Sequence, residues 1–158
     1  MEFGLVFALA GSALVIVLGG IGSSIGVGLA GQAAGGVITE DPDKFGSMIP
    51  LVGLPGTQGF YGLLIGFMVI IKLKLLTDAI IIPDLSTGLQ IFVICVSVGF
   101  VEMISSIHQG KVAVASVGLV AKRPEELGKG LILPAFVEIY AVLGLVAAFL
   151  LLLQVVKV

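Results

Sequence analysis

The sequence predicts an all-α integral membrane protein of four transmembrane helices, arranged as two helical hairpins in tandem. Of its 158 residues, 58% are hydrophobic and only 11% are charged, with a mean hydropathy of +1.25. An ordinary soluble domain carries roughly 25% charged residues. The chain also holds four long apolar runs, and a helix needs roughly 20 such residues to cross a bilayer. Finally, a single offset relates the first half of the chain to the second.

The first hairpin begins with a run that has no charged residue from Phe3 to Thr39. This run exceeds one span, so its helix either extends beyond the hydrocarbon or is strongly tilted. A polar turn, TEDPDK, follows, and its Pro42 ends one helix and helps start the next. A second uncharged run, at 45–71, contains several prolines and glycines. The first hairpin therefore comprises residues 1–78, with helices predicted at about 3–38 and about 45–75.

The second hairpin follows the longest connection, around Pro83. A polar turn, KRPEE at 122–126, separates its two apolar runs. The last run, Leu131–Leu153, contains a single charge at Glu138. This hairpin comprises residues 79–158, with helices predicted at about 85–121 and about 126–156.

An internal repeat supports the duplication. An offset of 82 residues aligns Pro42 with Pro124, and it aligns many other identical residues without a gap. Both hairpins run in the same direction, unlike the inverted repeats of many transporters. In this register Glu138 aligns with Gly56, so only the second hairpin has a carboxylate at that place. The further matches are Ser23–Ser105, Ser24–Ser106, Ile25–Ile107, Gly28–Gly110, Gly36–Gly118, Gly46–Gly128, Gly62–Gly144 and Phe67–Phe149.

The first helix is rich in glycine, which suits close contact between membrane helices. Gly31 and Gly35 form a second, shorter row beside the main one. The segment from Gly26 to Gly31 matches the G-x-G-x-x-G letters of dinucleotide-binding proteins, but no strand precedes it and no βαβ unit surrounds it. We interpret the glycines as a packing surface. The main row on one helical face is Gly22, Gly26, Ala30 and Ala34.

Composition excludes several classes of function. A net charge of −2 gives no basis for binding nucleic acid. A single cysteine, Cys95, cannot form an intrachain disulfide. The start, MEFG, carries an acid where a signal peptide has basic residues, so we expect no secretory signal peptide.

Glu138 is the residue that most needs a functional explanation. A carboxylate near the middle of a membrane helix costs ~2.5–3.5 kcal/mol on insertion scales. It is tolerated when it faces protein or water and has a partner. On the second helix, Thr57, Gln58 and Tyr61 lie at a comparable level. Their i, i+3 and i, i+4 spacings place all three on one side of that helix.

Two further groups complete a set of oxygen ligands. Pro55 lacks an N–H and disrupts the helix, so the carbonyl of Leu54 could turn toward a ligand. Gln109 is the amide at this depth on the third helix. Carboxylate, amide, hydroxyl and carbonyl oxygens suit hard cations rather than zinc or copper. Taken alone, however, Thr57 or Gln109 could simply bond to a neighbouring helix, which contributes ~0.6 kcal/mol, and Tyr61 could be an ordinary packed aromatic.

Three motifs support a family resemblance: LPGTQGFYG at 54–62, HQGK at 108–111 and PAFVEIYAVLG at 134–144. Over essentially its whole length the sequence resembles the K subunits of V-type (A/V-type) rotary ATPases, above all the bacterial sodium-translocating type. These are the duplicated proteolipids of the membrane rotor ring. The resemblance implies that Tyr61 locks the site by a hydrogen bond to the acid. It also implies a Na⁺ site formed by Leu54, Thr57, Gln58, Gln109 and Glu138.

The same resemblance implies a function and partners. Identical copies would form a ring in the lipid bilayer, and each copy would carry one Na⁺ at Glu138. A stator membrane subunit would supply an arginine that pairs with the emptied acid, and a central-stalk subunit would contact the two short turns. ATP hydrolysis or synthesis would take place in other subunits, so the chain would not be an enzyme by itself.

Two alternatives remain open. In a proton-translocating version of the same subunit, Glu138 would cycle between its protonated and charged forms. The surrounding oxygens argue against it, because a proton needs only one acceptor. A self-contained channel or porter is disfavoured by the small size of the chain and by the missing carboxylate in the first hairpin.

The distribution of basic residues weakly favours one orientation in the cell membrane. Four lie at the short turns and three at the opposite end, so we expect cytoplasmic turns and external termini. The first group is Lys44, Lys122, Arg123 and Lys129, and the second is Lys72, Lys74 and Lys157.

Glu102 and His108 do not fit the pattern. Glu102 lies two helical turns before Gln109 on about the same face. It could be a second carboxylate on the ion route, but we expect an acid at the membrane interface or in the lumen of the ring. We expect His108 to be packed or facing water, because no second metal ligand accompanies it.

Overall fold

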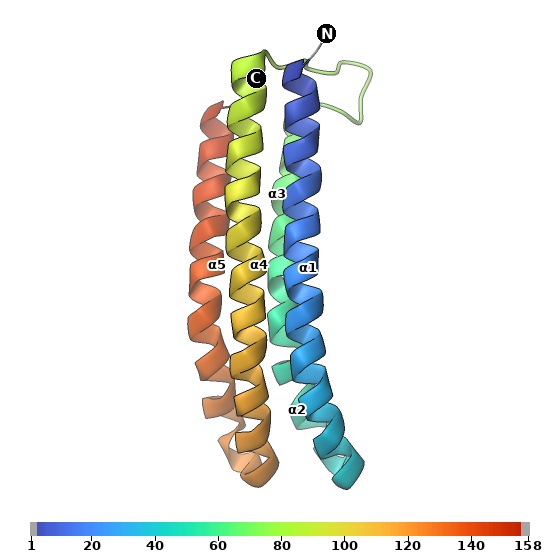
Figure 1. Ribbon diagram of the computed structural model, residues 1–158, viewed down its shortest axis with the longest axis vertical. Coiled ribbons are helices and arrows are strands. Elements are labelled where there is room, and N and C mark those ends of the chain that lie inside the picture. Colours follow the sequence, from blue (N-terminus) through green and yellow to red (C-terminus); the bar gives the residue numbers. More distant parts are fainter. Residues whose placement is uncertain (1–2, 156–158) are drawn as a thin grey trace.

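The computed structural model describes residues 3–155 and is an elongated bundle of helices (Figure 1). It contains four helical segments long and apolar enough to span a membrane, which confirms the predicted fold class. The last residue of the predicted fourth helix, at 156, lies outside the described residues. So do Glu2 and Lys157, which entered the predictions about a signal peptide and about orientation.

The four segments are built from five α-helices and three short 3₁₀ turns. The second and fourth segments each begin with a 3₁₀ turn that starts at a proline, Pro42 or Pro124. The second segment is further divided by a 3₁₀ turn at Leu54–Gly56. In chain order the helices are α1 (Phe3–Glu40), α2 (Phe45–Gly53), α3 (Thr57–Lys72), α4 (Leu85–Lys122) and α5 (Leu127–Val155).

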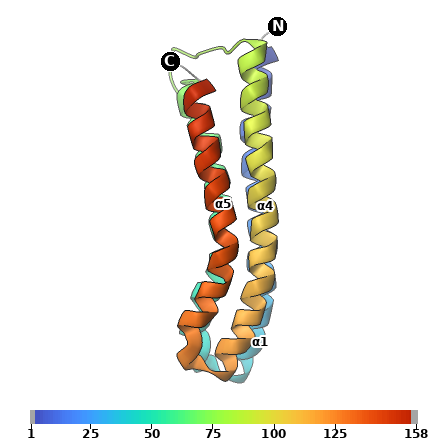
Figure 2. The ribbon, with the colours of Figure 1, turned by 90° about the vertical axis from the view of Figure 1, so that its left-hand side faces the viewer.

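The helices form two layers. Helices α1 and α4 make the most extensive contact and form one layer, while α3 packs on α1 and α5 packs on α4 to form the other. Figure 2 shows α4 in front of α1 and α5 alongside. Both short turns lie at one end, and the connection between α3 and α4 lies at the other (Figure 1). Each layer thus takes one helical segment from each half of the chain.

Glycine lets α1 and α4 approach closely. A Cβ atom placed on Gly26 would lie 2.5 Å from the carbonyl oxygen of Ser106, and one on Gly22 would lie 2.5 Å from the Cα of Met103. The main row of small residues on α1 is buried along its length. The shorter row differs, because a Cβ on Gly35 would meet nothing within 4 Å. In the shorter row only Gly31 meets another helix, since its Cβ would lie 3.8 Å from a methyl group of Val52.

Apolar side chains form one cluster at each end of the bundle. The first includes Val15, Ile65 and Ile91, and the second includes Met48 and Leu51. The buried side chains of Gln58 and Gln109 lie between these clusters. The fold therefore encloses a polar band in the middle of its apolar length.

We expect Gly110→Ala to destabilise the protein. Its new methyl group would lie 2.5 Å from the Cα of Gly26, and overpacking of this kind costs about 1–3 kcal/mol. Gly118→Ala on the same helix is the matched control, because its methyl group would meet nothing within 4 Å. Thermal unfolding of the purified protein in detergent should show a lower melting temperature for Gly110→Ala alone. Equal stability of the two variants would contradict close α1–α4 packing.

We expect Asp84 to stabilise the start of α4 in a pH-dependent way. Its carboxylate accepts a hydrogen bond from the backbone N–H of Thr87 at 2.8 Å. Hydrogen bonding from Thr87 holds the pKa of Asp84 below its ordinary value. Asp84 therefore stabilises the fold fully when the pH is above the ordinary pKa of an aspartate. This stabilisation is lost as the pH falls through the lower pKa that Asp84 has in the folded protein. Asp84→Ala should speed amide hydrogen exchange in the first turn of α4, whereas Asp78→Ala, in the preceding connection, should not.

Candidate ion-binding site

Glu138 is half-buried on α5, and side chains of two other helices hold its carboxylate. The hydroxyl of Tyr61, on α3, donates to Oε1 at 2.6 Å. The side-chain amide of Gln109, on α4, donates to Oε2 at 3.3 Å. Hydrogen bonds to an ionised oxygen are stronger than neutral ones. Both oxygens of the acid are thus engaged by donors on two helices, so three helices meet at the carboxylate.

Two fully buried glutamines extend the cluster inward. The amide of Gln58 donates to Oε1 of Gln109 at 2.6 Å. The amide of Gln109 also donates to the carbonyl oxygen of Pro134 at 3.2 Å. These bonds fix the direction of both amides, since each amide nitrogen faces an oxygen of the next helix. The glutamines therefore link α3 to α4 and α4 to α5.

The break between α2 and α3 contributes a carbonyl and a hydroxyl. The hydroxyl of Thr57 contacts the carbonyl oxygen of Leu54 at 2.9 Å and Oε1 of Gln58 at 3.3 Å. Pro55 lies in the 3₁₀ turn between the two helices. Its carbonyl oxygen accepts a hydrogen bond from the hydroxyl of Ser106, which ties the break to α4. The irregular backbone is thus covered by protein, as membrane depth requires.

All six predicted site residues belong to one connected hydrogen-bonded cluster. The structure brings them together from α3, α4, α5 and the 3₁₀ turn before α3. Their carboxylate, amide, hydroxyl and carbonyl oxygens are ligands that hard cations use. The members are Leu54, Thr57, Gln58, Tyr61, Gln109 and Glu138.

Two serines support the cluster and were not predicted from the sequence. Ser105 donates to the carbonyl oxygen of Val137 at 3.2 Å and accepts from the amide of Gln58 at 3.4 Å. Ser106 holds the break between α2 and α3 as described above. The repeat offered a signal, because it aligns Ser105 with Ser23, whose hydroxyl accepts from the backbone N–H of Gly59 at 2.8 Å. Related serines thus join the layers in both halves.

The prediction for Glu102 is wrong. An acid at the interface or in a lumen would be exposed, yet none of the surface of Glu102 is exposed. The physical reason is that the face of α4 shared by Glu102 and Gln109 is the face packed inside the bundle. His108 lies on another side of α4, exposed in an apolar groove of about 400 Å³ that Tyr140 also lines.

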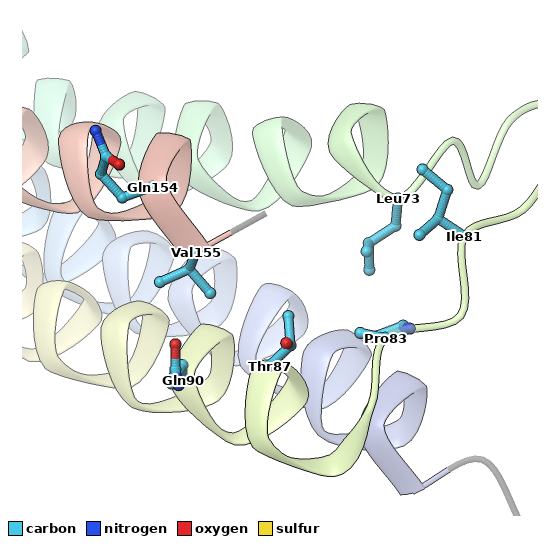
Figure 3. Close-up of a pocket in the computed structure, with 7 residues that line it drawn as sticks. All are labelled: Leu73, Ile81, Pro83, Thr87, Gln90, Gln154 and Val155. Atoms are coloured by element: carbon cyan, nitrogen blue, oxygen red, sulfur yellow. The ribbon is translucent and has the colours of Figure 1, made fainter. Parts of the chain in front are cut away.

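A larger pocket lies at the end of the bundle, away from the polar cluster (Figure 3). Its volume is about 620 Å³, and it lies between the connection that precedes α4 and the end of α5. None of its lining side chains is an acid, a base or a cysteine. They are Leu73, Ile81, Pro83, Thr87, Gln90, Gln154 and Val155.

Comparisons with known proteins agree with the resemblance read from the sequence. The chain is 43% identical to the V-type sodium ATPase subunit K of Enterococcus hirae over 151 residues, 96% of this chain and 93% of that protein. It is 34% identical to the A-type ATP synthase subunit K of Methanocaldococcus jannaschii over 154 residues, 97% of this chain. The chain spans 64% of that second relative's length.

The family model for the C subunit of ATP synthase matches the chain twice, at residues 10–69 and 92–151. The two matches start 82 residues apart, which is the offset found within the sequence. Each match covers most of one hairpin, and together they cover more than half of the chain. The protein therefore belongs to the ATP synthase C-subunit family and carries its helical hairpin in duplicate.

Proposed function

We propose that identical copies of this chain form a membrane rotor ring in which Glu138 of each copy binds one Na⁺. The observation that carries the proposal is that both oxygens of this intramembrane acid are held by residues of a single oxygen-rich cluster. The relative from Enterococcus hirae is named as a sodium ATPase subunit, which supports Na⁺ as the transported ion. Other subunits would hydrolyse or synthesise ATP.

The electrostatics of the membrane explain how such a site would couple ions to rotation. An ionised Glu138 facing lipid is costly, and one Na⁺ neutralises it. The bond from Tyr61 would hold the carboxylate in place while the site passes lipid. A stator arginine would pair with the emptied acid and so favour release of the ion. The ring could then turn only with occupied sites, except at the stator.

The two short turns are the proposed contact surface for a central stalk. Both lie at the same end of the bundle (Figure 1). Lys44 forms an ion pair with Asp41 at 3.3 Å and donates to the carbonyl oxygen of Ala121 at 2.8 Å, which joins the first turn to the end of α4 just before the second turn. Their basic residues support a cytoplasmic location, with the termini outside.

A proton-translocating ring is the alternative. A proton needs one acceptor oxygen, whereas Leu54, Thr57, Gln58 and Gln109 supply further oxygens close to the acid. This arrangement favours Na⁺. Membership of a rotary ATPase family likewise favours a ring subunit over a self-contained channel or porter.

We expect Na⁺ to protect Glu138 from carbodiimide at constant pH. The reagent attacks the protonated acid, and a bound Na⁺ would keep the acid ionised and covered. Mass spectrometry of the labelled chain measures the modification, with K⁺ at the same concentration as the salt control. Glu138→Gln should show no labelling at this position and no ion transport. Protection that follows pH alone would support the proton alternative, and normal Na⁺ pumping by Glu138→Gln would refute the site.

We expect Tyr61→Phe to weaken Na⁺ binding while the protein stays folded. The change removes a 2.6 Å hydrogen bond to the carboxylate, and a bond to a charged group contributes about 1.5–3 kcal/mol. The dissociation constant for Na⁺ should therefore rise by roughly 10- to 100-fold. Tyr140→Phe is the matched control, because Tyr140 is 68% exposed on the same helix as Glu138. Equal affinities in the two variants would remove Tyr61 from the site.

A further inference from the structure

Glu102 is a second carboxylate in the interior of the bundle, and its surroundings differ from those of Glu138. None of its surface is exposed. Among the residues that the structure describes, no group hydrogen bonds to either of its carboxylate oxygens. Glu138, in contrast, is half-buried and accepts a hydrogen bond at each oxygen. The two intramembrane acids therefore differ both in burial and in hydrogen bonding.

The contacts of α4 place Glu102 at the level of the smallest side chains in the bundle. Its neighbour Met103 lies against Gly22 of α1, and Ser105, one turn further on, bonds to Val137 of α5. Gly22, which faces this level from α1, has no side chain that could hydrogen bond to the acid.

The described helices provide no positive charge near Glu102. His108 and Lys111 are exposed on other sides of α4, and the remaining basic groups lie near the helix ends. Tyr61 and Glu138 are the titratable groups that face the interior from α3 and α5, and α1 contributes none at this depth. In full, the titratable side chains are Glu40 on α1; Tyr61 and Lys72 on α3; Cys95, Glu102, His108, Lys111 and Lys122 on α4; and Lys129, Glu138 and Tyr140 on α5.

We propose that Glu102 is a proton-binding site, so that each copy holds a proton at Glu102 while Na⁺ exchanges at Glu138. An ionised carboxylate without a donor or a counter-charge is costly in an apolar interior, and binding a proton removes the charge. The Na⁺ half of this statement rests on the proposed function. The proton half rests on Glu102 alone.

The burial of Glu102 favours a proton over the other possible partners. Na⁺ needs several oxygen ligands, and those in this band are gathered around Glu138 rather than Glu102. A side chain from a neighbouring copy cannot reach Glu102, because the helices of one copy already cover it completely. A proton needs only one of the two oxygens. The bound proton also prevents two negative charges from lying in the same polar band.

Infrared difference spectroscopy of the purified protein tests this proposal. A protonated carboxyl group has a carbonyl stretching band that ionised carboxylates lack, and the band shifts in D₂O. The sample is the full-length protein at neutral pH and saturating Na⁺, and the band is assigned by comparing the unmodified protein with its variants. We expect a protonated-carboxyl band in the unmodified protein, and we expect Glu102→Gln to abolish it.

Glu138→Gln separates this proposal from the proposed function. The variant lacks the carboxylate that is proposed to bind Na⁺. It should nevertheless keep the protonated-carboxyl band, because this band belongs to Glu102. A failure of Na⁺ binding in the unmodified protein would therefore leave this test intact. The absence of a protonated-carboxyl band in Glu138→Gln would overturn the proposal, as would a band that persists in the double variant with Glu102→Gln and Glu138→Gln. If Glu102→Gln does not fold, the spectrum of Glu138→Gln still decides the matter.

Discussion

The structure depends on the need to compensate the carboxylate of Glu138 inside an apolar bundle. Glu138 obtains hydrogen bonds from Tyr61 and Gln109, and these require α3 and α4 to lie beside α5 at one depth. Gln58 then bridges to Gln109 and fixes the position of α3. Because each of these groups would be costly without its partner, the polar cluster determines how the helices align along their axes.

Close packing of α1 against α4 makes this alignment possible. Gly22 and Gly26 bring the backbones of these two helices together, while serines of both halves join this layer to the layer of α3 and α5. In both hairpins, a serine on the first helix therefore bonds to the backbone of the second helix. Only the second hairpin carries the carboxylate, so one polar cluster forms between the two halves instead of one in each.

The fold class could be predicted from the sequence because charges and prolines divide the chain into apolar runs, and because the repeat relates the two halves. Five of the six cluster residues were recognisable since polar side chains are rare at membrane depth, and the Leu54 carbonyl was recognisable because Pro55 disrupts the helix there. Their roles in ion binding remain predictions. The burial of Glu102 could not be predicted, because α4 is apolar on most sides and periodicity does not reveal which face is covered. The supporting role of Ser105 likewise depends on a contact with α5.

The number of Na⁺ ions bound per chain tests the central claim most directly. Equilibrium binding of radioactive Na⁺ to the purified, assembled protein measures it against the chain concentration. The account predicts one saturable Na⁺ per chain, because one carboxylate lies in the oxygen-rich cluster and the other binds a proton. No saturable Na⁺ binding, or two Na⁺ ions per chain, would contradict it.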